Sequence, residues 1–132
     1  MKEDFLFTYG LLRKKANHEM GRFLSDSAVF LAEATYQGHL YLIDYYPGVI
    51  PTEDISKKVI GEVFSIRDKK LLEELDRFEG IGPAFPSPNE YRRELQEVQI
   101  KGGKTMEAWV YLYNRPVAQY PIIDSGDFLL RG

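Results

Sequence analysis

The chain of 132 residues is short enough for a single domain over residues 1–132 and long enough to bury one sizeable core. Hydrophobic residues make up 44% and charged residues 28%, a balance typical of globular rather than disordered proteins. The net charge of −3 provides no basic surface for nucleic acid, and the absence of cysteine excludes disulfides, thiolate catalysis and cysteine-ligated zinc.

The first residues, MKEDFLF, carry Glu3 and Asp4 where a signal peptide would have a basic and then a long apolar segment. No apolar run in the sequence is long enough to cross a bilayer. We therefore expect a cytoplasmic protein without a membrane partner.

The first predicted strand is FLFTY at 5–9, which alternates along its length and ends at Gly10. A weak helical pattern follows, in which Ala16, Met20 and Phe23 share one face. Further strands are predicted where β-branched and aromatic residues concentrate, at 28–36, 38–43, 59–66, 90–100 and 105–113. Proline- and glycine-rich stretches, YYPGVIPTE, IGPAFPSPNE, KGGK and NRP, separate them, and the glycines of KGGK predict a hairpin turn.

The clearest helix is DKKLLEELDRF at 68–78, followed by Glu79 and Gly80. One apolar face is expected to point inward, made of Leu71, Leu72, Leu75 and Phe78. The opposite face is expected to be solvated, made of Glu73, Glu74, Asp76 and Arg77. Asp76 has a second interpretation, as a residue that caps or orients the turn after the helix.

One clear helix and about six strands, without regular βα alternation, favour an α+β fold. The expected architecture is a small, mainly antiparallel β-barrel with one or two flanking helices.

Motifs for metal or nucleophilic catalysis are missing from the sequence. His18 and His39 are the only histidines, and neither lies at a metal-binding spacing, so both are expected at the surface or in ordinary hydrogen bonds. The sequence contains no GxSxG, P-loop or GxGxxG motif. It therefore predicts neither a metal site nor a cofactor.

Glu79 occupies an unusual place. It follows the inward-facing Phe78 at the C-terminus of the helix, where the negative end of the macrodipole disfavours a carboxylate. Burial at that position raises the pKa of a carboxyl group and makes it a better base. Local violations of this kind are typical of functional sites, so we expect one here.

A series of short segments runs in order from about residue 5 to residue 128: FTYGLLR, GHLYLIDYYPGVIP, GEVFSI, LDRFEG, EYRRE, AWVYLYNRP and IDSGDF. Their order and spacing resemble the γ-glutamylcyclotransferase-like (AIG2-like) family. The resemblance implies a small barrel with flanking helices and a pocket at one end. It also implies a small-molecule partner, a γ-glutamyl compound.

The implied reaction is attack of the α-amine of a γ-glutamyl group on its own γ-carbonyl, giving 5-oxoproline and a free amine or amino acid. Because the nucleophile is intramolecular, positioning alone can remove on the order of 7–11 kcal/mol of the barrier at best. The reaction then requires one base and hydrogen-bond donors for the developing oxyanion, without a cofactor.

The resemblance assigns roles to individual residues. Glu79 matches the acid/base glutamate of the family. Tyr9, Gly10, Leu11 and Leu12 match the loop whose backbone N–H groups bind the glutamyl part, and Gly10 permits a close approach. Leu11 departs from the family pattern, which usually has threonine or serine there, so any hydroxyl contact is lost.

Tyr91 and Tyr111 match tyrosines near the family's pocket. Their alternative interpretation is a ring packed in the barrel with its hydroxyl at the surface.

Two other function classes stay open. A catalytically silent small-molecule-binding barrel is consistent with Leu11, whereas Glu79 favours the enzyme. A barrel that binds nucleic acid or another protein is suggested only by the 14% aromatic content, and the acidic charge balance opposes nucleic acid. The sequence leaves open the oligomeric state and the leaving group, which includes a free amino acid, a polyamine, an ε-lysyl group or an antibiotic amide.

Overall fold

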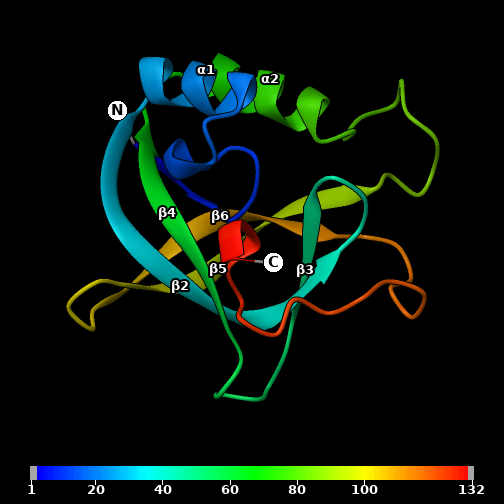
Figure 1. The fold of residues 1–132 in the computed structure, drawn as a ribbon. Coiled ribbons are helices and arrows are strands. Elements are labelled where there is room, and N and C mark those ends of the chain that lie inside the picture. Colours follow the sequence, from blue (N-terminus) through cyan, green and yellow to red (C-terminus); the bar gives the residue numbers. More distant parts are fainter. Residues whose placement is uncertain (1–2, 131–132) are drawn as a thin grey trace.

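A β-barrel with two α-helices lying across one end makes up this structure, a computed structural model that describes residues 3–130 (Figure 1). The strands in that range are β1 (Asp4–Thr8), β2 (Val29–Leu42), β3 (Pro47–Pro51), β4 (Lys58–Ile66), β5 (Tyr91–Ile100) and β6 (Thr105–Tyr113). The α-helices are α1 (Glu19–Ser27) and α2 (Lys69–Phe78), and the short 3₁₀ helices are η1 (Lys14–Ala16) and η2 (Phe128–Leu130).

Hydrogen bonding closes the sheet on itself. The strand order is β1-β4-β2-β3-β6-β5, with further pairings between β1 and β6 and between β2 and β5. Paired strands are antiparallel except that β6 runs parallel to both β1 and β3. The predicted class, an α+β fold built on a small, mainly antiparallel barrel with flanking helices, is confirmed.

Two predictions for the middle of the chain are wrong. The expected break at residue 37 does not occur, because β2 continues through Gly38. Glycine is required there, since a Cβ would lie 2.8 Å from the Ile50 carbonyl oxygen on β3. The proline-rich stretch YYPGVIPTE, expected only to separate two strands, contains β3, which pairs with the second half of β2. The predicted hairpin at Gly102 and Gly103 is confirmed, and both residues have positive φ angles.

The weak helical pattern corresponds to α1, which begins later than the predicted face. His18 caps this helix, since its Nδ1 accepts the N–H of Met20 at 3.1 Å. Met20 and Phe23 lie on α1, but Ala16 belongs to η1, so its predicted place on the same helix is wrong. Of the helices within residues 3–130, none combines the length and apolar character of a membrane span.

Helix α2 matches the predicted helix closely. Asp68 caps its N-terminus by accepting the N–H of Lys70, and Leu71, Leu72 and Leu75 are buried as predicted. The prediction for Phe78 is wrong: this residue is 39% exposed. It lies at the end of the helix, where the apolar face reaches the mouth of a cavity, so its ring lines that cavity.

Strand β1 lies at the boundary between two apolar clusters. Phe7 and Tyr9 belong to the cluster inside the barrel, whereas Leu6 packs with Leu24 of α1 and Leu75 of α2. This division follows from the alternation of side chains along a strand. The loop after β1 therefore emerges where the barrel meets the helices.

Candidate active site

The loop after β1 makes a tight turn over residues 10–13. The N–H of Arg13 donates to the Gly10 carbonyl at 3.0 Å. Gly10 packs so closely on β3 that a Cβ would lie 2.7 Å from Pro47 Cγ. From α1, a Cβ on Gly21 would lie 2.8 Å from the Leu11 carbonyl oxygen. The loop is therefore held between β3 and α1, with glycine at both close contacts.

The backbone N–H groups of this turn are available to a ligand. Among residues 3–130, the backbone N–H groups of Gly10, Leu11 and Leu12 donate no hydrogen bond. Backbone N–H groups are strong donors, so three adjacent unpaired ones are suited to an anionic or carbonyl oxygen.

These residues line a cavity of about 310 Å³ between the loop, the end of α2 and the start of β5. Every site residue predicted from the sequence contributes to its wall: Tyr9, Gly10, Leu11, Leu12, Glu79, Tyr91 and Tyr111. Further lining residues that sequence reasoning missed include Tyr45, Tyr46, Phe85 and Glu90.

Glu79 is the C-cap of α2, and its N–H donates to the Leu75 carbonyl at 2.9 Å. Gly80, with φ of +75°, then turns the chain away from the helix axis. Glu79 is half-buried and lines the cavity. Burial raises the pKa of Glu79 to about 8, and the charges of Glu90 and Asp76 act in the same direction.

Arg92 and Arg93, both on β5, pair with carboxylates other than that of Glu79. Arg93 bonds both carboxylate oxygens of Asp76, at 2.7 and 3.1 Å, and Arg92 pairs with Glu94. Over the described part of the chain, Glu79 takes part in no ion pair. Its carboxyl group is therefore uncompensated, which agrees with the raised pKa.

The prediction that Asp76 belongs to a solvated face is wrong. Its Oδ1 accepts a hydrogen bond from the Tyr111 hydroxyl at 2.8 Å as well as the bond from Arg93. The Arg93 guanidinium in turn lies 4.2 Å from the centre of the Trp109 ring. Asp76 precedes Glu79 by three residues, a helical spacing that places both on one face and could have indicated this role. Glu73, Glu74 and Arg77 are exposed as predicted.

The three predicted tyrosines point their hydroxyls into the protein. Tyr9 donates to the Tyr111 carbonyl at 2.5 Å, and Tyr91 donates to the Pro47 carbonyl at 2.6 Å. Burial raises the pKa of all three tyrosines above the usual value, so they remain protonated donors. The alternative interpretation, with the hydroxyls of Tyr91 and Tyr111 at the surface, is wrong.

Glu90 is a second carboxylate of the cavity. Its Oε2 accepts the Tyr46 hydroxyl at 2.5 Å, which fixes the side chain at the rim. Glu90 directly precedes Tyr91, a predicted site residue, and this adjacency in the sequence could have indicated its place in the cavity. Tyr46 was not predicted because it lies in YYPGVIPTE, a stretch that was expected only to separate two strands.

The family described as γ-glutamyl cyclotransferase, AIG2-like, matches residues 6–130. The chain is 37% identical over 130 residues to the γ-glutamylcyclotransferase family protein YtfP of Escherichia coli, covering 96% of both chains. It is 35% identical over 127 residues to the ytfP family protein of Citrobacter rodentium, again covering 96% of both.

Solved structures give the same result. The solution structure of YtfP from Escherichia coli superposes with a TM-score of 0.66 at 32% identity, covering 96% of this chain and 97% of that one. The crystal structure of an AIG2-like protein from Mus musculus gives a TM-score of 0.73, covering 91% of this chain and 83% of that one. At 20% identity, this second likeness supports the fold alone.

Proposed function

This chain belongs to the γ-glutamyl cyclotransferase, AIG2-like family, and from that premise we propose that it is an enzyme that converts γ-glutamyl compounds to 5-oxoproline. The second product is the amine or amino acid that was attached to the γ-carbonyl. The reaction is intramolecular and needs no water or external nucleophile.

One observation carries this proposal. The carboxyl group of Glu79, which has no ion-pair or side-chain hydrogen-bond partner within residues 3–130, lines the same cavity as three unpaired backbone N–H groups, and its pKa is raised to about 8. A general base works best when its pKa lies near the working pH. The N–H groups supply the donors that a glutamyl carboxylate or a developing oxyanion requires.

The proposed reaction moves protons from the substrate α-ammonium to the leaving nitrogen through Glu79. Ionised Glu79 takes a proton from the substrate α-ammonium, and the free amine attacks the γ-carbonyl carbon, closing a five-membered ring. The carbonyl oxygen becomes an oxyanion that backbone N–H groups of the loop stabilise. Protonated Glu79 then delivers its proton to the leaving nitrogen as the bond between the γ-carbon and that nitrogen breaks. The restored carboxylate takes the second proton from the ring nitrogen and passes it to the departing amine, which leaves the neutral lactam and ionised Glu79.

The remaining cavity residues bind and orient the substrate in this proposal. Gly10, Leu11 and Leu12 contact the glutamyl part through their backbone. Tyr9, Tyr91 and Tyr111, which are buried, form part of the cavity wall.

A second candidate, a barrel that binds a small acid without turnover, is favoured by one feature. Leu11 offers no hydroxyl group to the ligand, so binding in this loop depends on backbone donors. Both candidates require 5-oxoproline or a similar acid to bind, and only the enzyme releases 5-oxoproline from a γ-glutamyl compound.

The test is incubation of the protein with a panel of γ-glutamyl compounds, scored for 5-oxoproline. The panel contains γ-glutamyl amino acids, γ-glutamyl polyamines, γ-glutamyl-ε-lysine and an antibiotic γ-glutamylamide. Release that disappears in the Glu79→Gln variant supports the enzyme. Binding of 5-oxoproline without release from any panel member supports the silent barrel.

A further inference from the structure

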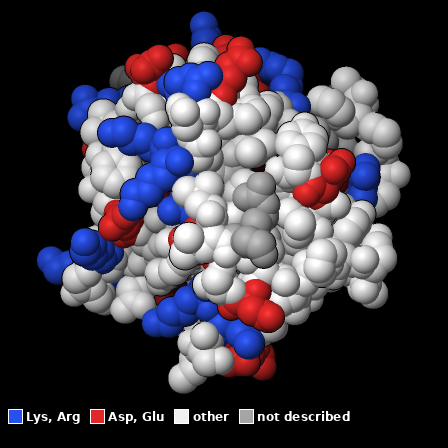
Figure 2. Space-filling view, in the orientation of Figure 1, with Lys and Arg blue, Asp and Glu red and all other residues white. Residues whose placement is uncertain are grey.

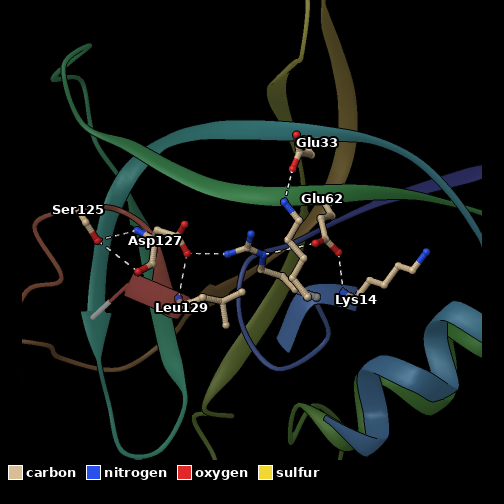
Figure 3. Close-up of polar contacts among 8 residues, drawn as sticks. Lys14, Glu33, Glu62, Ser125, Asp127 and Leu129 are labelled. Atoms are coloured by element: carbon tan, nitrogen blue, oxygen red, sulfur yellow. Dashed lines mark hydrogen bonds and ion pairs between the residues drawn. The ribbon is translucent and has the colours of Figure 1, made fainter. Parts of the chain in front are cut away.

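A buried ionic cluster lies directly behind the loop that lines the cavity. On the face shown in Figure 2, positively and negatively charged side chains are intermixed at the surface. Arg13 and Glu62 differ, since they are only 2% and 1% exposed. Asp127 is the third member of this cluster. Figure 3 shows Glu62 and Asp127 at opposite ends of the cluster.

Glu62, on β4, holds the end of the loop. Its Oε1 accepts the backbone N–H of Lys14 at 2.6 Å, and its Oε2 lies 3.7 Å from Arg13 Nε. The Glu62 carboxylate therefore contacts the side chain of Arg13 and the backbone of Lys14, the two residues that follow Leu12. Because β4 pairs with β1 on one side and with β2 on the other, this anchor belongs to a strand that is hydrogen-bonded along both edges.

Asp127 holds the same loop from the C-terminal segment. Its Oδ1 accepts Arg13 Nη1 at 2.8 Å and the N–H of Leu129 at 2.9 Å (Figure 3). The segment that carries it is itself fixed, because the Gly126 carbonyl accepts the Ile60 N–H at 2.7 Å and Phe128 is buried in the barrel core. Arg13 thus connects the loop to two rigid anchors that are distant in sequence.

Stability alone does not account for these charges. Buried ion pairs cost desolvation free energy and are often no more stabilising than apolar residues of the same volume. This cluster is also incomplete as an ion pair, since Arg13 Nε has no hydrogen-bond partner within the described residues. What the charges provide is attachment: their contacts join the end of the loop to β4 and to the C-terminal segment, and none of the three residues lines the cavity.

We propose that Arg13, Glu62 and Asp127 are positioning residues that hold the loop so that the N–H groups of Gly10, Leu11 and Leu12 stay free for the substrate. This inference rests on the proposed function. A turn released from these anchors can rotate its peptide groups and pair its N–H groups with protein acceptors. The substrate would then lose its donors although every cavity side chain is retained.

The test compares Glu62→Gln and Asp127→Asn, which remove a charge and keep the shape. Asp127 has a side chain that is 17% exposed, so its variant is the milder one and keeps the test possible if Glu62→Gln fails to fold. Val98→Ala, in the barrel core and outside the cavity wall, serves as a control that is destabilised without touching the cluster.

Three quantities are measured for each variant: the Kd of 5-oxoproline, the split between KM and kcat, and the NMR order parameters of the Leu11 and Leu12 amides. We expect both cluster variants to raise Kd and KM about tenfold or more and to lower kcat as well, because the same N–H groups stabilise the oxyanion. The order parameters should fall from the rigid value of about 0.85 toward about 0.6. Val98→Ala should lower the melting temperature and leave all three quantities unchanged.

The outcomes separate the two proposals. If the parent protein releases no 5-oxoproline from any substrate, the proposed function fails, and the order parameters still decide the positioning role. If the cluster variants melt earlier but keep rigid loop amides and the parent Kd, the cluster only stabilises the fold and the positioning role is overturned.

Discussion

The hydroxyl of Tyr111 donates to Oδ1 of Asp76 at 2.8 Å, which joins strand β6 to helix α2 beside the cavity that Tyr111 lines. The same carboxylate is bonded by Arg93, so Asp76 is fully engaged. Glu79, three residues later on the helix, has no such partner within residues 3–130. Of the two carboxylates, only Glu79 is therefore free to exchange a proton with a substrate.

Asp76→Asn should shift the pH dependence of the reaction. Burial is the main cause of the raised Glu79 pKa, and the charges of Glu90 and Asp76 add to it. Removing the Asp76 charge should lower that pKa, so the acid limb of the kcat/KM profile should move to lower pH from its midpoint near 8. Glu73→Gln removes a charge from the exposed face of the same helix and should leave the profile in place. A profile unmoved in Asp76→Asn would contradict this coupling.

Glu79→Gln should abolish most of the activity. The amide keeps the size of the side chain but cannot act as a base, so release of 5-oxoproline should fall by roughly 10²- to 10⁴-fold. The Kd of 5-oxoproline should change little, because the loop N–H groups are untouched. Turnover at the parent rate would show that Glu79 is not the base.

The stability of Glu79→Gln should depend on pH differently from that of the parent protein. The folded pKa of Glu79, about 8, lies above the unfolded value of 4.5, so folding favours the protonated form. The parent should lose this contribution to stability as pH rises from about 4.5 to about 8, by a few kcal/mol at most, since the group keeps some solvent contact. Glu79→Gln should lack this loss and should melt above the parent at pH 8. Equal pH dependence of melting in both proteins would contradict the raised pKa.

Leu75→Ala tests the packing of α2. Leu75 is completely buried, so its truncation should cost about 2–5 kcal/mol of unfolding free energy, measured by denaturant titration. Glu74→Ala, on the exposed face, is the matched control and should change stability by less than about 0.5 kcal/mol. A small loss for Leu75→Ala would mean that α2 is not docked through this face.

Helix α2 and Glu79 could be predicted because their signals are local, within a stretch of about a dozen residues. The roles of Asp76 and Arg13 could not, since their partners are distant in sequence. Tyr111 lies 35 residues from Asp76, and Asp127 lies 114 residues from Arg13. A charged residue on a helix or in a loop has the same local pattern whether it is solvated or paired inside the protein.

Strand β3 was missed for a related reason. Pro47 and Pro51 are ordinary turn signals, but here they lie at the two ends of a strand, where the missing N–H groups are tolerated. The continuity of β2 through Gly38 likewise depends on the approach of the Ile50 carbonyl, a contact that only the folded barrel creates.

The last prediction tests whether the loop binds through its backbone. Gly10→Ala places a Cβ against the Pro47 ring, at 2.7 Å from Cγ, so the turn must shift and the Kd of 5-oxoproline should rise about tenfold or more. Leu11→Thr leaves the backbone in place, so its Kd should stay within about threefold of the parent even if the added hydroxyl alters turnover. Calorimetric titration measures both, and a crystal soaked with 5-oxoproline should place its oxygens at the N–H groups of residues 10–12. Loss of binding in Leu11→Thr with normal binding in Gly10→Ala would reverse the assignment, since the Leu11 side chain would then be the contact.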